Sequence, residues 1–383
     1  MDPRRRLLLD LLEAALGRVN GRSAVRTALA ARTDVGPVHL AAVGKAAASM
    51  ALGAHDALGP RVRSALIITK DGHADAEAVG LPGVELMEAA HPVPDDRSIA
   101  AGVRLLRWVD ELPAGERPLI LVSGGASSLV EAPAQGVSLD DLVRLNIAGL
   151  ASGRDITALN VERTRLSRIK GGRLAGRLLG QRALALFISD VPGDDPDVIG
   201  SGLMGTLAGR ADDIERIVVA SVGAAVAAAA DAAKRAGLEA VAAADRFDGE
   251  ASRLAVRFVH ELHMSPVPVR IWGGESTVTL PAHAGRGGRN QHLALAAARL
   301  IAGRDDLMLM AVGTDGTDGP TTDAGAIVDG ETCARLALAD IDVEQALIDA
   351  DSGAALAAAG DLLDTGPTDT NVGDLVIGLR RAR

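Results

Sequence analysis

The sequence predicts a two-domain α/β fold, in which a Rossmann-like domain with a mostly parallel sheet and a helical section precedes a smaller α/β domain with a mixed sheet. In the first half, short apolar runs alternate with helical patterns, which is typical of βαβ units. A new series of apolar runs follows a long alanine-rich segment. The length of 383 residues exceeds one ordinary core and fits two domains. We therefore expect domains at 1–240 and 241–383.

The first domain begins with an amphipathic helix, because Asp10 and Glu13 interrupt the apolar stretch that a signal peptide would need. Strands are expected at 38–43, 65–69, 84–88, 118–122 and 183–188. Repeated leucine spacings over 139–182 predict a helical section packed on this sheet. The alanine-rich segment 211–237 predicts one surface helix that ends at a glycine.

The second domain is expected to contain strands at 267–272, 277–280, 307–312 and 375–379. A mixed sheet suits these runs. The sequence shows no repeat of fixed period that would indicate a solenoid or propeller.

The composition limits the classes of partner. A net charge of −10 argues against a nucleic-acid surface, which needs clustered basic residues. The only cysteine, Cys333, excludes an internal disulfide and favours a reducing compartment. The longest bland run, 222–230, is far shorter than the roughly 20 residues of a membrane span. We expect a soluble cytoplasmic protein without nucleic-acid or membrane partners.

Two strand-to-helix turns of the first domain carry candidate site residues. After the first strand, Gly44 makes a turn and Lys45 stands at a helix start, where a cation is unfavourable unless an anion offsets it. The run SGGASS after the strand at 118–122 could cradle phosphate through backbone amides, or could simply cap a helix. The polar residues of that run are Ser123, Gly124, Gly125, Ser127 and Ser128.

Acidic residues follow two buried strands. Asp190 is the carboxylate directly after the strand at 183–188, and Asp315, Asp318 and Asp323 lie in the glycine-rich loop after the strand at 307–312. Ligands of α/β sheets collect outside the carboxyl ends of strands, so these carboxylates could serve as a base or bind a divalent metal. Aspartates also suit turns for local hydrogen-bonding reasons.

Basic and amide side chains complete the candidates. Arg289 and Asn290 introduce a helix after a glycine-rich loop and could clamp a carboxylate or phosphate. Among the basic residues of the helical section, only Lys170, beside two glycines, suggests more than a solvated face. Asn371 lies in a polar loop before the last strand. The eight histidines show no zinc-ligand spacing.

Several motifs together resemble the type II glycerate kinases, from about Ala42 to Leu375. These motifs are GKAAASM, TKDGH, HPVPD, SGGASSL, LSRIKGGRLA, SDVPGDDPDVI, GGESTVTL, GRGGRNQ, GTDGTDGPT and TGPTDTNVGDL. The resemblance implies ATP-dependent phosphorylation of D-glycerate, at the 2-hydroxyl to give 2-phosphoglycerate, with Mg²⁺. It also implies an active site in the cleft between the two domains. A homodimer is a possible assembly.

The resemblance also implies roles for individual residues. Lys45 and Arg289 match the family's basic positions, and Asp190 and Asp315 match its acidic positions, where one would orient or deprotonate the hydroxyl. Asp315 and Asp318 would hold Mg²⁺. The residues expected to bind substrate or nucleotide are Gly44, Ser123, Gly124, Gly125, Ser127, Ser128, Lys170, Asn290, Thr314 and Asn371.

The chain departs from the family pattern at several places, including the absence of the aromatic residues often found shortly before TGPTDTN, and these departures leave alternatives open. His292 replaces a usual glutamate, IGSGLM replaces IASGPT, and Asp369 replaces a usual glycine. The alternatives are a kinase for another short hydroxy acid, a hydroxypyruvate reductase and a catalytically silent ligand-binding paralogue. The reductase would need a G-x-G-x-x-G fingerprint after a strand, which the sequence lacks.

Overall fold

The computed structural model describes residues 2–152, 156–210 and 213–381. Its internal contacts divide the chain into two compact units, which we name unit 1 and unit 2. Unit 1 comprises Met1–Arg18, Val222–Thr368 and Gly373–Arg383, and unit 2 comprises Val19–Ser221 and Asp369–Val372. This division differs from a boundary at residue 240, because helix α10 (Val222–Arg235) packs on strands of the unit 1 sheet.

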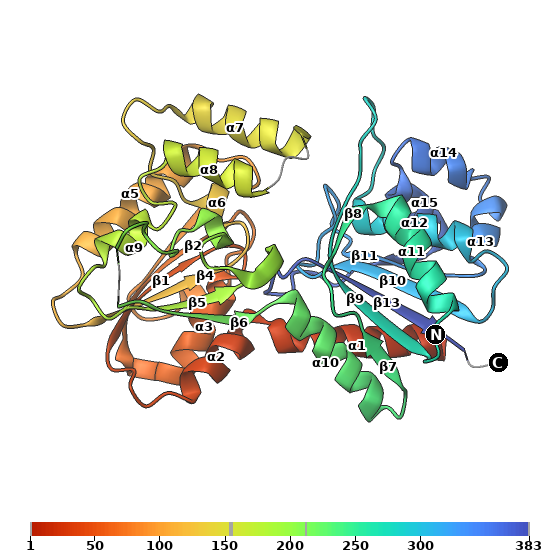
Figure 1. The fold of residues 1–383 in the computed structure, drawn as a ribbon, viewed down its shortest axis with the longest axis horizontal. Coiled ribbons are helices and arrows are strands. Elements are labelled where there is room, and N and C mark those ends of the chain that lie inside the picture. Colours follow the sequence, from red (N-terminus) through yellow and green to blue (C-terminus); the bar gives the residue numbers. More distant parts are fainter. Residues whose placement is uncertain (1, 153–155, 211–212, 382–383) are drawn as a thin grey trace. The chain divides into compact units, whose positions relative to one another are not determined.

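Unit 2 is built on six parallel strands in the order β3-β2-β1-β4-β5-β6 (Figure 1). The strands are β1 (Val38–Val43), β2 (Val62–Lys70), β3 (Val84–Ala89), β4 (Arg117–Val122), β5 (Leu184–Ile188) and β6 (Glu215–Ala220). The order reverses between β1 and β4, as in the doubly wound Rossmann arrangement. The predicted Rossmann-like parallel sheet is confirmed.

Helices flank this sheet, so its central strands are almost continuously apolar, as buried parallel strands require. The helices of unit 2 are α2 (Gly21–Ala30), α3 (Ala47–Leu58), α4 (Ala76–Val79), α5 (Asp96–Asp110), α6 (Ala126–Leu129), α7 (Leu139–Ser152), α8 (Ile156–Leu166) and α9 (Arg173–Arg177). Short 3₁₀ turns are η1 (Gly59–Arg61), η2 (Pro192–Asp194) and η3 (Ile199–Ser201). Helices α7 to α9 confirm the predicted helical section.

Unit 1 contains a seven-stranded mixed sheet in the order β12-β11-β10-β13-β9-β7, with β8 paired to β9 (Figure 1). Strand β13 runs antiparallel to both β9 and β10. The strands are β7 (Ala240–Ala242), β8 (Phe247–Glu250), β9 (Val269–Thr277), β10 (Leu307–Gly313), β11 (Gly325–Asp329), β12 (Leu362–Leu363) and β13 (Asp374–Arg380). The predicted mixed-sheet domain is confirmed.

The helices of unit 1 include the first helix of the chain, α1, which joins the C-terminal half. They are α1 (Pro3–Val19), α10, α11 (Ala251–His263), α12 (Arg289–Leu300), α13 (Thr332–Leu338), α14 (Val343–Ile348) and α15 (Ser352–Ala359). Phe258 packs between Phe247 and Trp272 in the core, with ring centroids 5.1 and 4.9 Å away. No helix in the described ranges combines the length and apolarity that crossing a bilayer requires.

Two sequence-based assignments are wrong. The segment 211–237 does not form one helix, because the β-branched run in Glu215–Ala220 pairs with β5 as an edge strand before α10 begins. No strand forms at 278–280 either. Strand β9 passes straight through two glycines from Val269 to Thr277, and the chain then leaves the sheet.

Candidate functional site

Two loops meet at the point where the strand order of unit 2 reverses. Val43 and Val122 are opposite each other in the register of β1 and β4, so the following loops start at the same level. The N–H of Lys45 donates to the carbonyl of Gly124 at 2.9 Å. Gly44 has a φ of 130°, and a Cβ there would lie only 2.2 Å from Ser123 Oγ. The loop after β1 therefore needs a glycine to approach the loop after β4.

Gly124 brings an aspartate and an asparagine together. Asp190 follows β5, and its Oδ2 accepts a hydrogen bond from Asn371 Nδ2 at 3.2 Å. A Cβ on Gly124 would lie 2.2 Å from that Nδ2 and 2.3 Å from Asp190 Oδ2. Gly124 thus leaves space for the Asp190 carboxylate, and the Asn371 amide fixes the orientation of that carboxylate. Asp190 and Asn371 both lie beside the SGGASS loop.

Histidine 91 is a site residue to which the sequence analysis gave no role. A Cβ on Gly125 would lie 3.3 Å from His91 Nε2 and 3.2 Å from Lys45 Cγ, so both side chains reach the same point of the loop. His91 follows strand β3 of the same parallel sheet. That position after a strand, within the motif HPVPD, is the signal that could have singled it out.

The serines of the loop serve mainly to hold it in place. Ser123 Oγ accepts the N–H of Ala46 at 3.1 Å, and Ser128 Oγ donates to the carbonyl of Gly125. Ser127 Oγ lies 2.8 Å from Ser201 Oγ. Within the described part of the chain, the backbone N–H groups of Gly124 and Gly125 donate no hydrogen bond. These two amides, rather than the hydroxyls, suit a phosphate oxygen.

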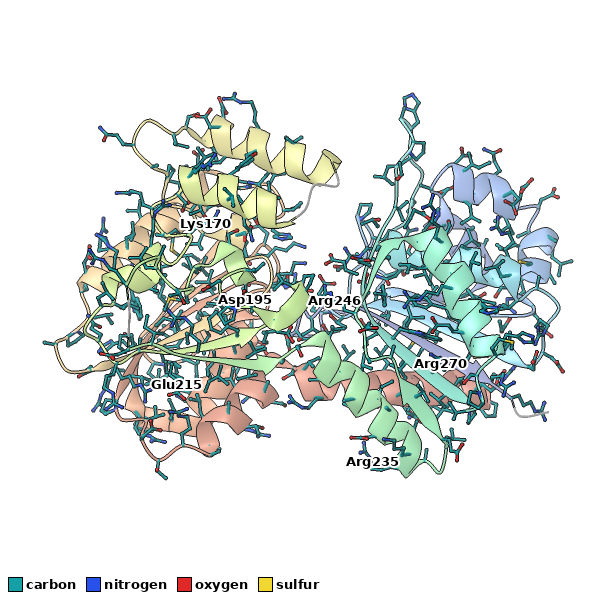
Figure 2. All side chains as sticks on the ribbon, in the orientation of Figure 1. Lys170, Asp195, Glu215, Arg235, Arg246 and Arg270 are labelled. Carbon is teal, nitrogen blue, oxygen red and sulfur yellow. The ribbon has the colours of Figure 1, made fainter. Side chains whose placement is uncertain are left out.

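Lys170 is enclosed by protein. Its Nζ lies 2.5 Å from Glu131 Oε2, and both side chains are 3% exposed. Lys170 is labelled in Figure 2. Glu131 Oε1 also accepts from Ser167 Oγ. Burial lowers the pKa of the Lys170 ammonium, and the charge of Glu131 opposes that shift. This arrangement fits a structural ion pair better than the ligand contact that the sequence suggested.

In unit 1, charged side chains gather at one edge of the sheet. Gly274, Asp374 and Gly313 lie in one row of the register, where β10 ends, the antiparallel β13 begins and β9 has three residues left. Arg289 Nε lies 2.8 Å from Asp374 Oδ2, and its Nη1 lies 2.6 Å from Glu275 Oε1. Asp374 is fully buried. The guanidinium is therefore held in a fixed orientation by two carboxylates.

These carboxylates also keep the Arg289 guanidinium positively charged. Burial lowers its pKa, but the charges of Asp374 and Glu275 outweigh burial and raise the pKa overall. Arg246, marked in Figure 2, contacts the same Glu275 at 3.3 Å. The sequence analysis quoted the motifs that contain Glu275 and Asp374 but gave neither residue a role. Their partner lies up to 85 positions away, which no local pattern reveals.

Asp318 caps a helix. Its Oδ1 accepts the N–H of Asn290 at 3.1 Å and its Oδ2 accepts the N–H of Gln291 at 2.8 Å, so it closes the start of α12. Burial raises the pKa of the carboxyl to about 7, against the lowering effect of these two amides. Because both oxygens already accept backbone N–H groups, Asp318 does not fit the role of metal ligand that we expected.

Asp315 remains the better metal candidate. It is partly exposed, and its Oδ1 accepts the N–H and hydroxyl of Thr317, both at 3.1 Å. The Thr314 hydroxyl is tied to the carbonyl of Gly373 at 2.6 Å. Across the described residues, no three His, Cys, Asp or Glu side chains form a metal cage. A Mg²⁺ ion that is held mostly by nucleotide phosphates needs only one or two carboxylates, which Asp315 can satisfy.

The predicted site residues thus form two groups, one in each unit. Lys45, Asp190 and Asn371 surround the glycine loop of unit 2, and Arg289, Asn290, Thr314 and Asp315 lie at the sheet edge of unit 1. The amide Nδ2 of Asn290 and Oδ1 of Asp315 both lie within 3.6 Å of the point where a Cβ on Gly313 would stand.

Two departures from the family pattern have structural explanations. Asp369 adopts a φ of 59°, the left-handed region in which glycine is the least strained residue. Its carbonyl accepts the N–H of Gly21 at 2.9 Å. His292 is buried on α12, with Nε2 3.0 Å from Ser252 Oγ, and burial lowers the pKa of its ring.

Comparison with known families accounts for most of the chain. The model described as "Domain of unknown function (DUF4147)" matches residues 7–208, and the MOFRL family model matches residues 268–374. The first match ends within unit 2, and the second covers the strands and loops that carry Arg289 and Asp315.

Individual proteins match over the whole length. The D-glycerate 2-kinase of Thermotoga maritima is 36% identical, with 98% of each chain covered. A putative hydroxypyruvate reductase of Agrobacterium vitis is 36% identical over 87% of this chain and 96% of its own length. The solved structure of glycerate kinase from Thermotoga maritima matches with a TM-score of 0.89 and 36% identity, covering 100% of both chains.

Proposed function

Because this chain belongs to the glycerate kinase family, we propose that ATP is its phosphoryl donor and that the 2-hydroxyl of D-glycerate is the acceptor. The observation that carries this proposal is the full-length match, combined with the cluster of Lys45, Asp190 and Asn371 around two free backbone amides. Phosphoryl transfer depends mainly on positioning and charge neutralisation, which such a cluster supplies.

In unit 2, Lys45 and the amides of Gly124 and Gly125 bind the phosphoryl group. The ammonium and two N–H donors neutralise and orient phosphate oxygens as negative charge shifts during transfer. His91 contacts the same oxygens, since its ring reaches the same point of the loop as Lys45.

Asp190 accepts the proton of the attacking hydroxyl. The 2-hydroxyl oxygen of glycerate forms the new bond to the γ-phosphorus while the bond from that phosphorus to the bridging oxygen breaks, which leaves ADP. The proton passes to the Asp190 carboxylate, which Asn371 holds in place. Asp315 is the other candidate for this step.

In unit 1, Arg289 binds the carboxylate of glycerate through the N–H groups that its own carboxylate partners leave available. We assign Asp315 to Mg²⁺, which would neutralise the nucleotide phosphates. The proposed reaction therefore uses groups from both units.

The reductase alternative has a specific weakness. A nicotinamide-binding domain of this strand order carries its glycine fingerprint in the loop after the first strand. Here that loop reads VGKAAASM, with the single glycine Gly44 followed by Lys45. Because one relative, from Agrobacterium vitis, is named a putative hydroxypyruvate reductase, reductase activity should be measured directly. Oxidation of NADPH in the presence of hydroxypyruvate would reveal it.

The decisive experiment measures ADP release from ATP and D-glycerate by wild type, Lys45→Ala and Arg289→Ala. Each substitution should lower kcat/KM by roughly 100-fold or more, because it removes a charge that contacts the reacting groups. Phosphorus NMR of the product identifies the hydroxyl that is phosphorylated.

Exposed residues of the same types provide matched controls. Lys234→Ala and Arg257→Ala remove charges that are 61% and 44% exposed, and should leave kcat/KM unchanged. Near-normal activity of Lys45→Ala with an unaltered melting temperature would refute the assignment. A cytoplasmic location and a homodimer also remain proposals, and sedimentation tests the dimer.

A further inference from the structure

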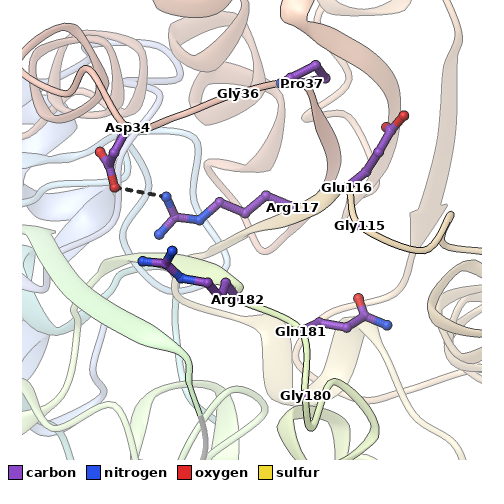
Figure 3. Close-up of a pocket in the computed structure, with 9 residues that line it drawn as sticks. All are labelled: Asp34, Gly36, Pro37, Gly115, Glu116, Arg117, Gly180, Gln181 and Arg182. Atoms are coloured by element: carbon purple, nitrogen blue, oxygen red, sulfur yellow. Dashed lines mark hydrogen bonds and ion pairs between the residues drawn. The ribbon is translucent and has the colours of Figure 1, made fainter.

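A cavity of about 520 Å³ lies in unit 2 at the edge of the sheet opposite Lys45 and Asp190 (Figure 3). Its lining comes from the segments that enter β1, β4 and β5, whereas the candidate site follows the carboxyl ends of the same strands. We call it the amino-edge pocket. Its lining residues are Asp34, Gly36, Pro37, Gly115, Glu116, Arg117, Gly180, Gln181 and Arg182. The volume suits a small molecule.

Two acidic residues around this pocket, Asp34 and Glu215, are already neutralised by arginines. Asp34 lies 2.9 Å from Arg32 and 3.1 Å from Arg117, and Glu215 contacts the same two arginines at 2.6 and 3.3 Å. Hydrogen bonds from Arg32, and then from Arg117, lower the pKa of Asp34 to about 2. Glu116 Oε2 lies 2.7 Å from His39 Nε2. The carboxylates of Asp34 and Glu215 therefore do not oppose an anionic occupant, whereas Glu116 is neutralised only when the His39 ring is protonated.

One cation of the pocket is left without such a partner. Arg182 makes no ion pair or hydrogen bond within residues 2–152, 156–210 and 213–381. Figure 3 shows its guanidinium extending in the same direction as that of Arg117, toward the side of the pocket where Asp34 lies. The charge of Arg182 is the one that an occupant would neutralise.

Three buried polar atoms of the lining residues make no hydrogen bond in the described part of the chain. They are the donor Arg117 Nε and the acceptors Gln181 Oε1 and Glu116 Oε2, of which the last lies beside His39. Native proteins satisfy nearly all such atoms with protein, water or ligand. An occupant that matches this wall needs an acceptor for the arginines and a donor for the glutamine oxygen.

We propose that the amino-edge pocket binds a small hydroxylated anion, either a hydroxy acid or its phosphate ester. The anionic group pairs with Arg182 and Arg117, and a hydroxyl donates to Gln181 Oε1. Since the pocket lies at the amino ends of the strands, an occupant there does not contact Lys45 or Asp190 and acts as an effector. This inference concerns binding and does not depend on the reaction that the enzyme catalyses.

The test measures binding of D-glycerate, 2-phosphoglycerate and inorganic phosphate to the full chain without nucleotide, by calorimetry. The Lys45→Ala/Arg289→Ala background removes the groups assigned to the phosphoryl group and to the glycerate carboxylate at the other site, so that the remaining binding belongs to the amino-edge pocket. In that background, adding Arg182→Glu should weaken binding of the hydroxylated anion at least tenfold. Arg177→Glu is the matched control, because Arg177 is exposed and lies outside the pocket lining.

A second variant tests the hydroxyl contact. Gln181→Met removes the acceptor, and should reduce the preference for D-glycerate over propionate without abolishing the binding of either anion. Equal affinities of the Lys45→Ala/Arg289→Ala protein with and without Arg182→Glu would overturn the proposal. Binding of phosphate with the same affinity as D-glycerate would overturn its hydroxyl component. If Arg182→Glu does not fold, the Gln181→Met variant still tests the hydroxyl contact. An unchanged preference of that variant for D-glycerate over propionate overturns the contact.

Kinetics separate this proposal from the proposed function. Arg182→Glu should leave kcat/KM at low glycerate within about twofold of wild type, because Arg182 does not touch the reacting groups. Loss of activity in Lys45→Ala with intact binding at the amino-edge pocket supports both proposals. Full activity in Lys45→Ala contradicts the catalytic assignment alone.

Discussion

At the scale of single residues, glycines position the candidate site because they lack side chains. The sequence suggests that Gly124 and Gly125 expose amides to a phosphate. The structure adds that Gly124 leaves space for the hydrogen bond between Asp190 and Asn371, which are 181 positions apart in the chain. No sequence pattern indicates that pairing.

Substituting Gly124 tests this close packing. Gly124→Ala places a methyl group 2.2 Å from Asn371 Nδ2, so the carboxylate of Asp190 must move. We expect kcat/KM to fall roughly 10- to 100-fold, since small misplacements of catalytic groups have effects of that order. Gly17→Ala, which has no atom within 4 Å of the new Cβ, is the control and should retain full activity. Equal activities of the two variants would contradict the packing argument.

The raised pKa of Asp318 predicts a pH dependence of stability. A carboxyl whose pKa rises from 3.8 to about 7 binds its proton more tightly in the folded state. The folded protein should therefore lose stability as the pH rises from 4 to 7, on the order of 1 kcal/mol per pH unit from this group. Asp318→Asn removes the titration and keeps one acceptor for the helix start.

The measurement is the difference in unfolding free energy between wild type and Asp318→Asn at several pH values. A difference that changes with pH between 4 and 7 supports the raised pKa. A constant difference over that range would mean that the two amides keep the carboxylate ionised throughout.

At the scale of elements, the ion pair between Lys170 and Glu131 connects the start of α9 with the chain that follows α6. Both charges are enclosed, so each depends on the other. The sequence located the helices of this section but not the pair, because 39 positions separate the partners.

Breaking this pair should destabilise unit 2. Lys170→Met leaves the Glu131 carboxylate without its cation and should cost roughly 3 to 5 kcal/mol. The double variant Lys170→Met/Glu131→Gln should recover part of that loss. Trp108 lies in unit 2 and Trp272 in unit 1. Urea unfolding in a Trp272→Phe background therefore reports on unit 2. Equal stability of Lys170→Met and Lys170→Met/Glu131→Gln in that background would contradict the prediction.

At the scale of the whole molecule, the chain does not divide into consecutive halves. Helix α1 belongs to unit 1, where Arg5 lies 2.8 Å from the buried Asp361 and Arg4 donates to the carbonyl of Asp305. Residues 369–372 belong instead to unit 2, where they deliver Asn371 to Asp190. These crossings explain why a boundary drawn along the sequence differs from the observed units.

Removing the first helix tests this exchange. Deletion of residues 2–18 should destabilise unit 1, because Asp361 loses one of its two arginines and the apolar face of α1 is lost. In a Trp108→Phe background, Trp272 fluorescence should show a lower urea midpoint. The matched Trp272→Phe background should show a smaller change in the unfolding that Trp108 reports. A larger loss in unit 2 would contradict the assignment of α1.

The sequence by itself determined strands β1 to β5 of the parallel sheet, the helical section and the motifs that carry Lys45, Asp190 and Arg289. These are local patterns, because alternation, helical spacing and loop composition lie within a few neighbouring residues. Only the tertiary structure decided that Asp318 caps a helix, that Lys170 is buried and that Asp374 and Glu275 orient Arg289. Those contacts join distant segments where strands end at a common edge, and burial then fixes which charges must pair.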